Sequence, residues 1–188
     1  MKMIIVYSSV TGNTRSVAEA VHDAMPPGAM LAPVHKAPDP ETFDLILLGF
    51  WVRRARPDPR MLRYMSSIKN KNVAWFGTLA AWPDSPHAMQ VRNAANSFLE
   101  ENRVLGGFLC QGRLEAKRFE ACMNGLGAKA STHPLTEERK ARLIEAARHP
   151  DETDFASARI YFADIITQSG IPAETMLTQP SWSDESSP

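Results

Sequence analysis

The chain has 188 residues, a mean hydropathy of −0.27, and 21 basic against 21 acidic side chains. This balance excludes nucleic acid or an anionic membrane surface as the default partner, and no apolar run is long enough to span a bilayer. Cys110 and Cys122 have no CxxC spacing, and the five histidines suggest no metal site. We expect one domain with reduced thiols, no signal peptide and a cytoplasmic location.

The chain opens with an expected strand, a loop of small polar residues and a helix. Residues 3–7 are β-formers, and apolar residues at helical spacing begin at Val17. The start of a helix has unpaired N–H groups and a partial positive charge, which favour an anion. The loop contains no lysine, so hydroxyls and backbone amides would hold a phosphate, although an ordinary strand–turn–helix is the structural alternative. The candidate ligands are Ser9, Val10 through its amide, Thr11, Gly12, Asn13 and Thr14.

Strands and helices are expected to alternate through the next hundred residues. A weak strand is predicted near residues 30–34, continuous apolar strands over 45–50 and 73–77, and a last strand over 104–110. Asp58-Pro59 and Ser85-Pro86 each combine an N-cap residue with proline at the first helical position, so helices should begin there. Such alternation predicts an α/β fold in which a doubly wound parallel sheet is covered on both faces.

The motif at residues 9–14 resembles the phosphate loop of flavodoxins, which binds the phosphate of FMN. The family usually has a hydroxyl residue where this chain has Val10. The resemblance extends over about residues 1–125 and implies a flavodoxin-like five-stranded parallel sheet in the order 2-1-3-4-5, with a C-terminal helical extension. It also implies that FMN lies outside the carboxyl ends of strands 1, 3 and 4.

Two later loops match the flavodoxin loops that enclose the isoalloxazine ring. After the third strand, Trp51 lies where the family places a stacking aromatic residue, with Phe50 and Val52 beside it. Packing in the core is the alternative role for Trp51. After the fourth strand, the family's Gly- and Asp-rich loop is absent, and the resemblance is positional only. The residues expected to hold the ring edge there are Thr78, Leu79, Ala80, Ala81 and Trp82.

Charge around the loop after the third strand differs from the acidic flavodoxins that the motif resembles. The five arginines there are Arg53, Arg54, Arg56, Arg60 and Arg63. They form either a solvated basic face or a group of charges that affects the flavin potential and selects a partner with an acidic docking face.

The last third of the chain has no counterpart in a minimal flavodoxin. Helices are expected from about Leu114 to Gly125, from Thr136 and from Asp151. Residues 149–158 resemble the tail of a flavodoxin-like subgroup that accompanies bilirubin reductases in anaerobic bacteria. We expect a single domain over residues 1–178, with a core over about 1–125, a helical extension over about 126–178, and a disordered tail over 179–188.

Three functions are compatible with these residues. The first is an FMN-binding electron carrier for a partner oxidoreductase, for which a bilirubin-type reductase is one candidate. The second is a small NAD(P)H-dependent FMN oxidoreductase, and the third is a flavin-free partner-binding module. No catalytic residue or metal ligand is assigned: Gly49 replaces the acceptor Asp of receiver domains, and no Cys-x5-Arg phosphatase motif occurs. The oligomeric state is left open.

Overall fold

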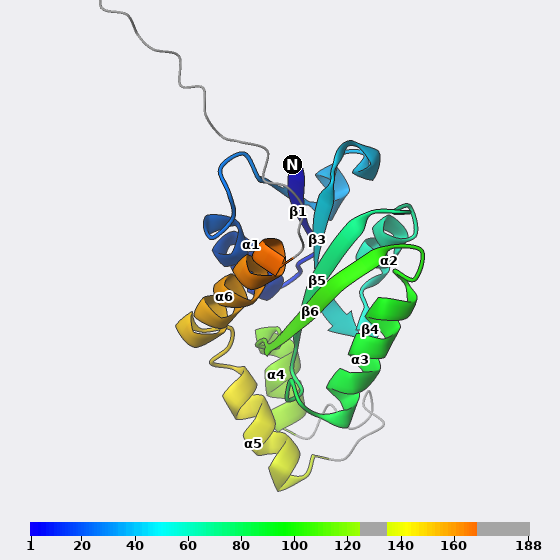
Figure 1. Cartoon of the computed structure of the whole chain (residues 1–188). Coiled ribbons are helices and arrows are strands. Elements are labelled where there is room, and N and C mark those ends of the chain that lie inside the picture. The colour runs from blue at the N-terminus through cyan, green and yellow to red at the C-terminus, as the bar shows by residue number, and fades with distance from the viewer. Residues whose placement is uncertain (125–134, 169–188) are drawn as a thin grey trace, which may run out of the picture.

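The computed structural model describes residues 1–124 and 135–168 and has a β-sheet between two helical layers (Figure 1). The strands are β1 (Met3–Tyr7), β2 (Met30–Pro33), β3 (Leu45–Arg53), β4 (Arg56–Pro57), β5 (Asn72–Leu79) and β6 (Arg103–Gln111). The α-helices are α1 (Asn13–Asp23), α2 (Pro59–Met65), α3 (Pro86–Ser97), α4 (Ala116–Met123), α5 (Glu137–Ala146) and α6 (Glu152–Gln168). Two short 3-10 helices follow β2, η1 (Val34–Lys36) and η2 (Pro40–Thr42).

The five long strands are parallel and lie in the order β2-β1-β3-β5-β6. When these five strands are numbered without β4, their order is the expected 2-1-3-4-5. The additional strand β4 pairs antiparallel with the end of β3 and forms a short hairpin there. The sequence pattern does not predict β4, because a strand of two residues has no periodicity to detect.

Alternate residues of the central strands fill two separate cores. Ile4 of β1 belongs to the core shared with α2 and α3, whereas Ile5 belongs to the core shared with α1 and α6. Figure 1 shows these two helical layers on opposite faces of the sheet. Because both faces are covered, strands such as β3 consist of continuous apolar residues instead of alternating ones.

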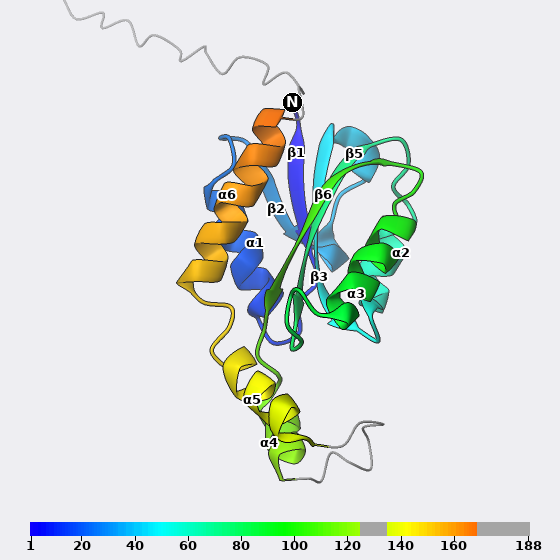
Figure 2. The same ribbon diagram turned by 60° about the horizontal axis from the view of Figure 1, so that its bottom comes forward.

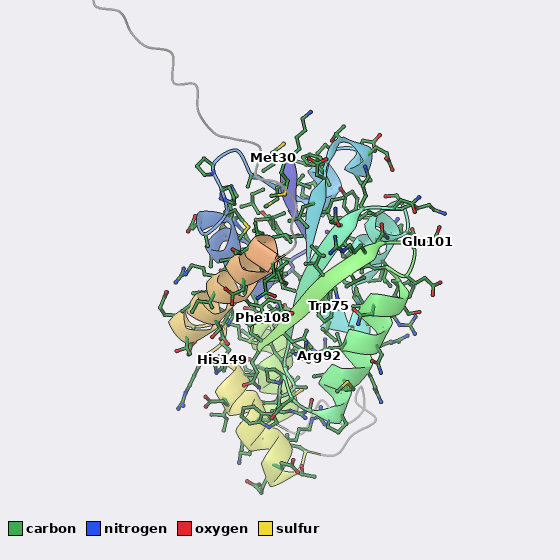
Figure 3. All side chains as sticks on the ribbon, viewed as in Figure 1. Met30, Trp75, Arg92, Glu101, Phe108 and His149 are labelled. Atoms are coloured by element: carbon green, nitrogen blue, oxygen red, sulfur yellow. The ribbon has the colours of Figure 1, made fainter. Side chains whose placement is uncertain are left out.

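Two consecutive glycines in β6 allow close packing on both sides of that strand. A Cβ on Gly107 would lie 2.1 Å from the Trp75 ring, and one on Gly106 would lie 2.6 Å from the Tyr161 hydroxyl. The Gly107 N–H donates to that hydroxyl at 2.9 Å, and Arg92 donates to the Gly107 carbonyl at 2.9 Å. Figure 3 shows Trp75 and Arg92 on the α3 side of β6. The glycines therefore serve packing and do not interrupt the strand.

The C-terminal helices divide into two groups with different positions. Helix α6 packs beside α1 and over β6, with Ala158 and Phe162 fully buried, so it completes one helical layer. Helices α4 and α5 lie beyond the carboxyl edge of the sheet in both views (Figures 1 and 2). The expected end of a helix near Gly125 and the expected disordered tail at 179–188 fall outside the described residues.

Candidate functional site

The carboxyl ends of β1, β3, β5 and β6 meet at one edge of the sheet, because these strands are parallel. Loop 8–12 follows β1 at this edge and leads into α1. The β3–β4 hairpin and the residues after β5 lie at the same edge. Ligands of open α/β sheets bind outside this edge, so these segments define the candidate site.

Loop 8–12 enters α1 without a side-chain cap. The N-cap residue, Gly12, has φ 93°, a conformation that residues other than glycine rarely adopt. No described side chain accepts a hydrogen bond from the first turn of this 11-residue helix. Within the described residues, Ser9 Oγ is shielded from solvent and has no hydrogen-bond partner. Free amides at a helix start beside an unpaired hydroxyl form a donor set suited to a phosphate.

Asn13 and Thr14 are both buried, and their side chains fix the start of α1 to β5 and to the segment that follows β6. Asn13 Nδ2 donates to the Arg113 carbonyl at 2.8 Å, and the Thr14 and Thr78 hydroxyls are hydrogen-bonded at 2.9 Å. The backbone amides of Asn13 and Thr14 are therefore better placed for an anion than their side chains. Val10 and Thr11 are exposed at the tip of the loop.

Asp58 joins the end of β1 to the start of α2. Its Oδ1 accepts hydrogen bonds from the Ser8 hydroxyl at 2.9 Å and from the Arg60 N–H at 3.0 Å, as expected for the N-cap of α2. The carboxylate is buried, and among the described residues its Oδ2 has no partner. Asp58 Oδ2 is therefore a buried hydrogen-bond acceptor beside loop 8–12 that no described donor satisfies.

The aromatic residues at the end of β3 differ in exposure. Phe50 is fully buried and packs on Trp75, with ring centroids 5.6 Å apart. Its side chain is therefore engaged in the core, and only its backbone is available to a ligand. Trp51 and Val52 are half-buried, and Trp51 lies opposite Thr78 of β5.

The residues after β5 also divide between the core and the surface. Thr78, Leu79 and Ala81 are buried, and Leu79 and Ala81 belong to the core beneath α2 and α3. The side chains of Leu79 and Ala81 pack in the core and the Thr78 hydroxyl is bonded to Thr14, so the backbone groups of these residues are what a ligand could reach. Ala80 is half-buried, and Trp82 is 39% exposed.

The turn of the β3–β4 hairpin carries exposed basic side chains. Its two central residues, Arg54 and Ala55, both have positive φ, of 54° and 58°, in a turn where Gly or Asn is more usual. We call Arg53, Arg54 and Arg56 the hairpin arginines. All three are exposed, and none forms an ion pair with a described residue. Their charge is available to a ligand or a partner.

Two cavities adjoin loop 8–12. The α4 cavity, of about 560 Å³, lies between the loop tip and the segment that leads into α4, and its lining includes Val10, Arg113 and Phe119. The β2 cavity, of about 460 Å³, lies between the loop and the end of β2, and its lining includes Lys36 and Arg60. Val10 contributes to the lining of both cavities.

The end of β6 also contributes to the site, which was not predicted from the sequence. A Cβ on Gly112 would lie 2.8 Å from Asn13 Nδ2, so glycine allows this segment to approach α1 closely. The next residue, Arg113, accepts the Asn13 hydrogen bond through its carbonyl, and its N–H donates to the His149 carbonyl at 2.9 Å. The sequence did carry one indication of this contribution. The last expected strand is parallel to the others, so its carboxyl end lies at the same edge of the sheet as theirs.

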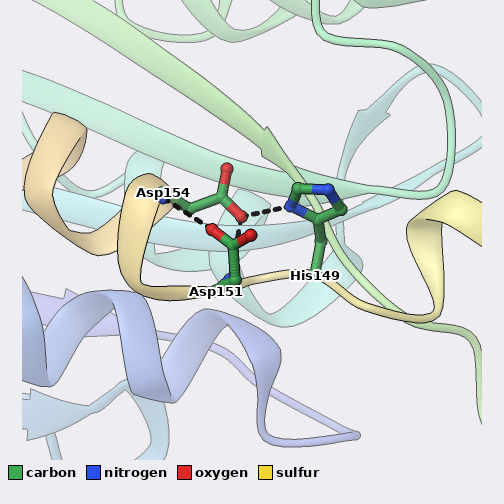
Figure 4. A group of neighbouring side chains, drawn as sticks. All are labelled: His149, Asp151 and Asp154. Carbon is green, nitrogen blue, oxygen red and sulfur yellow. Dashed lines mark hydrogen bonds and ion pairs between the residues drawn. The ribbon is translucent and has the colours of Figure 1, made fainter.

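His149 lies at the junction between α5 and α6 (Figure 4). Its Nδ1 is 2.5 Å from Asp154 Oδ2, and its Nε2 is 3.5 Å from Glu145. Burial lowers the pKa of His149, but the hydrogen bond and the charge of Asp154 raise it more, so the pKa lies above its ordinary value. Asp151 and Asp154 exchange backbone-to-carboxylate hydrogen bonds of 2.9 and 3.0 Å, which is the geometry of a helix start. Although these three side chains could reach one metal ion, their hydrogen bonds already account for the arrangement.

The family model for the flavodoxin domain matches residues 4–163. The chain belongs to the flavodoxin family. A flavodoxin-like domain-containing protein named BilS, from Clostridioides difficile (strain CD3), is 27% identical over 176 residues, which cover 91% of this chain and 99% of the relative. This similarity agrees with the flavodoxin-like subgroup to which residues 149–158 were assigned.

Two solved structures share the flavodoxin fold with this chain. Oxidised flavodoxin 2 from Bacillus cereus has a TM-score of 0.51 at 18% identity, covering 90% of this chain and 99% of that protein. A flavoprotein in complex with FMN from Lactobacillus acidophilus has a TM-score of 0.50 at 18% identity, covering 57% and 92%. At these identities the likeness concerns the fold.

Two further properties of this flavodoxin-family chain concern membrane-spanning helices and the reactivity of its cysteines. No helix among residues 1–124 and 135–168 is long and apolar enough to cross a membrane. Both cysteines are free, and burial raises the pKa of the Cys110 thiol, so this residue is a poor nucleophile.

Proposed function

We propose that the protein binds FMN and transfers electrons to or from a partner oxidoreductase. The observation that carries this proposal is the uncapped start of α1 beside the unpaired Ser9 hydroxyl, at the carboxyl edge of a flavodoxin sheet. The FMN complex of the Lactobacillus acidophilus flavoprotein supports the same cofactor. Bound FMN supplies one- and two-electron redox chemistry, and the chain supplies binding, orientation and the local electric field.

In this proposal, loop 8–12 and the first turn of α1 bind the phosphate. Ser9 and Thr11 donate through their hydroxyls, and Val10, Gly12, Asn13 and Thr14 donate through backbone amides. A backbone amide at Val10 replaces the hydroxyl that the family usually has there, so its apolar side chain does not conflict with phosphate binding.

Trp51 and the segment after β5 hold the ring in this proposal. Trp51 is half-buried, so part of its ring is available for stacking, with Val52 beside it. Backbone groups of residues 78–81 face the ring edge, and the partly exposed Trp82 restricts water on a second side. Phe50 contributes from beneath by packing on Trp75.

A titration of the flavin-free protein with FMN and with riboflavin tests the phosphate site. Hydrogen bonds to a charged group contribute about 1.5–3 kcal/mol each, so FMN should bind about 100-fold more tightly or better. Thr11→Val should lower the affinity for FMN about tenfold and leave the affinity for riboflavin nearly unchanged. Thr153→Val, at an exposed position on α6, is the matched control and should alter neither affinity.

Comparable affinities for the two flavins would contradict the phosphate-site assignment. If neither flavin bound, a flavin-free partner-binding module would become the better account of the chain.

The partner is proposed to be an oxidoreductase with an acidic docking face, and a bilirubin-type reductase is the leading candidate. The similarity to BilS and the resemblance of residues 149–158 support this candidate, and the hairpin arginines supply a complementary charge. We place the carrier in the cytoplasm because its cysteines are free. Consumption of NADH or NADPH by the isolated protein would instead indicate a stand-alone FMN oxidoreductase.

A further inference from the structure

The β2 cavity has a basic lining that the flavin phosphate alone does not require. It lies between loop 8–12, the end of β2, η1 and the start of α2, and it has a volume of about 460 Å³. The basic side chains that line it are Arg15, His35, Lys36 and Arg60, and no acidic residue is among the described residues of its lining. Pockets for small organic ligands have volumes of about 300–1,000 Å³, so this space exceeds the needs of a single phosphate.

The charges in the β2 cavity are only partly neutralised. Arg15 is paired with Glu19 at 2.8 Å, whereas Lys36 and Arg60 form no ion pair with a described residue. The buried Asp58 carboxylate accepts the Ser8 hydroxyl hydrogen at 2.9 Å and does not line the cavity. Lys36 and Arg60 approach from different elements, which favours an anion held between them.

The same cavity also offers apolar surface. Tyr7, Pro33 and Val34 line it together with Val10, and Tyr7, Pro33 and Val34 are half-buried. An aromatic face and a proline suit a flat heterocycle, while the cations suit a phosphate. A ligand with both groups fits this combination better than a simple anion or an apolar molecule.

We infer that the β2 cavity binds a nucleoside phosphate. The inference rests on the proposed function in one respect: Ser9 and Gly12 line the cavity and also belong to the loop that would hold the flavin phosphate. A second phosphate attached to that one can therefore enter the cavity directly. The nucleoside phosphate is then either the AMP half of FAD or a separate adenine nucleotide bound beside FMN.

The experiment compares FMN, FAD and AMP on the wild type and on charge-removing variants. Flavin-free protein is titrated with FMN and FAD, and FMN-loaded protein is titrated with AMP by calorimetry. The variants are Lys36→Gln, Arg60→Gln and the double variant. Arg63→Gln is the matched control, because Arg63 is on the same helix as Arg60 but does not line the cavity.

The two sources of the nucleotide give different results. If the source is FAD, the double variant lowers the affinity for FAD by about tenfold or more and the affinity for FMN by less than about twofold. If the source is a separate nucleotide, AMP binds the FMN-loaded protein and the same variant abolishes this binding. In both cases Arg63→Gln behaves like the wild type. The inference is overturned if FAD binds no differently from FMN in every variant and AMP binding is absent or insensitive to Lys36 and Arg60.

Failure of the proposed function is distinguishable from failure of this inference. If the wild type does not bind FMN, the phosphate-loop assignment fails, and AMP binding to the flavin-free protein then reports on the cavity by itself. Circular dichroism of each variant verifies that the fold is retained.

Discussion

The carboxylate of Asp154 makes the junction between α5 and α6 sensitive to pH. It accepts from the Asp151 N–H at the start of α6 and contacts the ring of His149 at 2.5 Å. Asp154→Asn removes the charge, keeps the size and leaves a weaker acceptor. We expect it to lower the free energy of unfolding by more at acidic pH than at alkaline pH.

The sign follows from the raised pKa of His149 in the folded state. A raised folded pKa means that the stabilisation is fully present below the unfolded pKa of about 6.5 and is lost as pH rises through the folded value. A hydrogen bond to a charged group contributes about 1.5–3 kcal/mol and a helix-start bond about 1 kcal/mol. The expected loss in the free energy of unfolding is therefore about 2.5–4 kcal/mol at pH 5.5 and about 1 kcal/mol at pH 9.

Urea unfolding of wild type and variant at the two pH values measures this difference, provided that the denaturant dependence is unchanged. Glu152→Gln is the matched control, because it removes an exposed carboxylate from the same turn of α6 without touching His149. Glu152→Gln should lower the free energy of unfolding by less than about 1 kcal/mol at either pH. An equal loss for Asp154→Asn at pH 5.5 and pH 9 would refute the role assigned to His149.

Three further changes have expected outcomes. Trp51→Ala should weaken FMN about tenfold, because stacking on a half-buried ring is lost, while the melting temperature falls little; a protein that unfolds would show that Trp51 belongs to the core. Gly107→Ala should destabilise the fold by about 1–3 kcal/mol in denaturant unfolding, because its Cβ would meet the Trp75 ring; an unchanged midpoint would contradict this packing. Replacing the hairpin arginines together by Gln should make the flavin potential more negative, on the order of tens of mV if they lie about 10 Å from the ring, and should remove the salt dependence of partner reduction. A redox titration and stopped-flow rates at two salt concentrations measure both effects, and no change in either would leave the arginines as a solvated face.

The sheet order was predictable because the polar loop at residues 9–14 identified a strand–helix start of known topology. The apolar run at 45–50 marked a strand buried on both faces, but it did not show where that strand ends. In the structure β3 continues to Arg53, and the pleat places Phe50 in the core. The sequence alone therefore did not show that the Phe50 side chain faces the core while Trp51 and Val52 remain partly accessible.

Other parts of the candidate site depend on contacts that no local pattern reports. The turn at Arg54 and Ala55 has the geometry of a hairpin but lacks the Gly or Asn that usually indicates one. The hydrogen bond from Asn13 to Arg113 joins residues 100 positions apart. The basic side chains of the β2 cavity come from three separate stretches of the sequence, so their proximity appears only in the folded chain.

The position of α6 has a consequence for how the protein forms during synthesis. Phe162 is fully buried, and its ring lies 5.8 Å from that of Phe76 and 5.3 Å from that of Tyr161. Chains leave the ribosome amino end first, so loop 8–12 and all the strands emerge before this aromatic cluster can form. For that interval the α1 face of the sheet exposes apolar surface to chaperones and to other nascent chains. A chain released at residue 125 would remain in that state permanently, although it contains every expected flavin-binding residue.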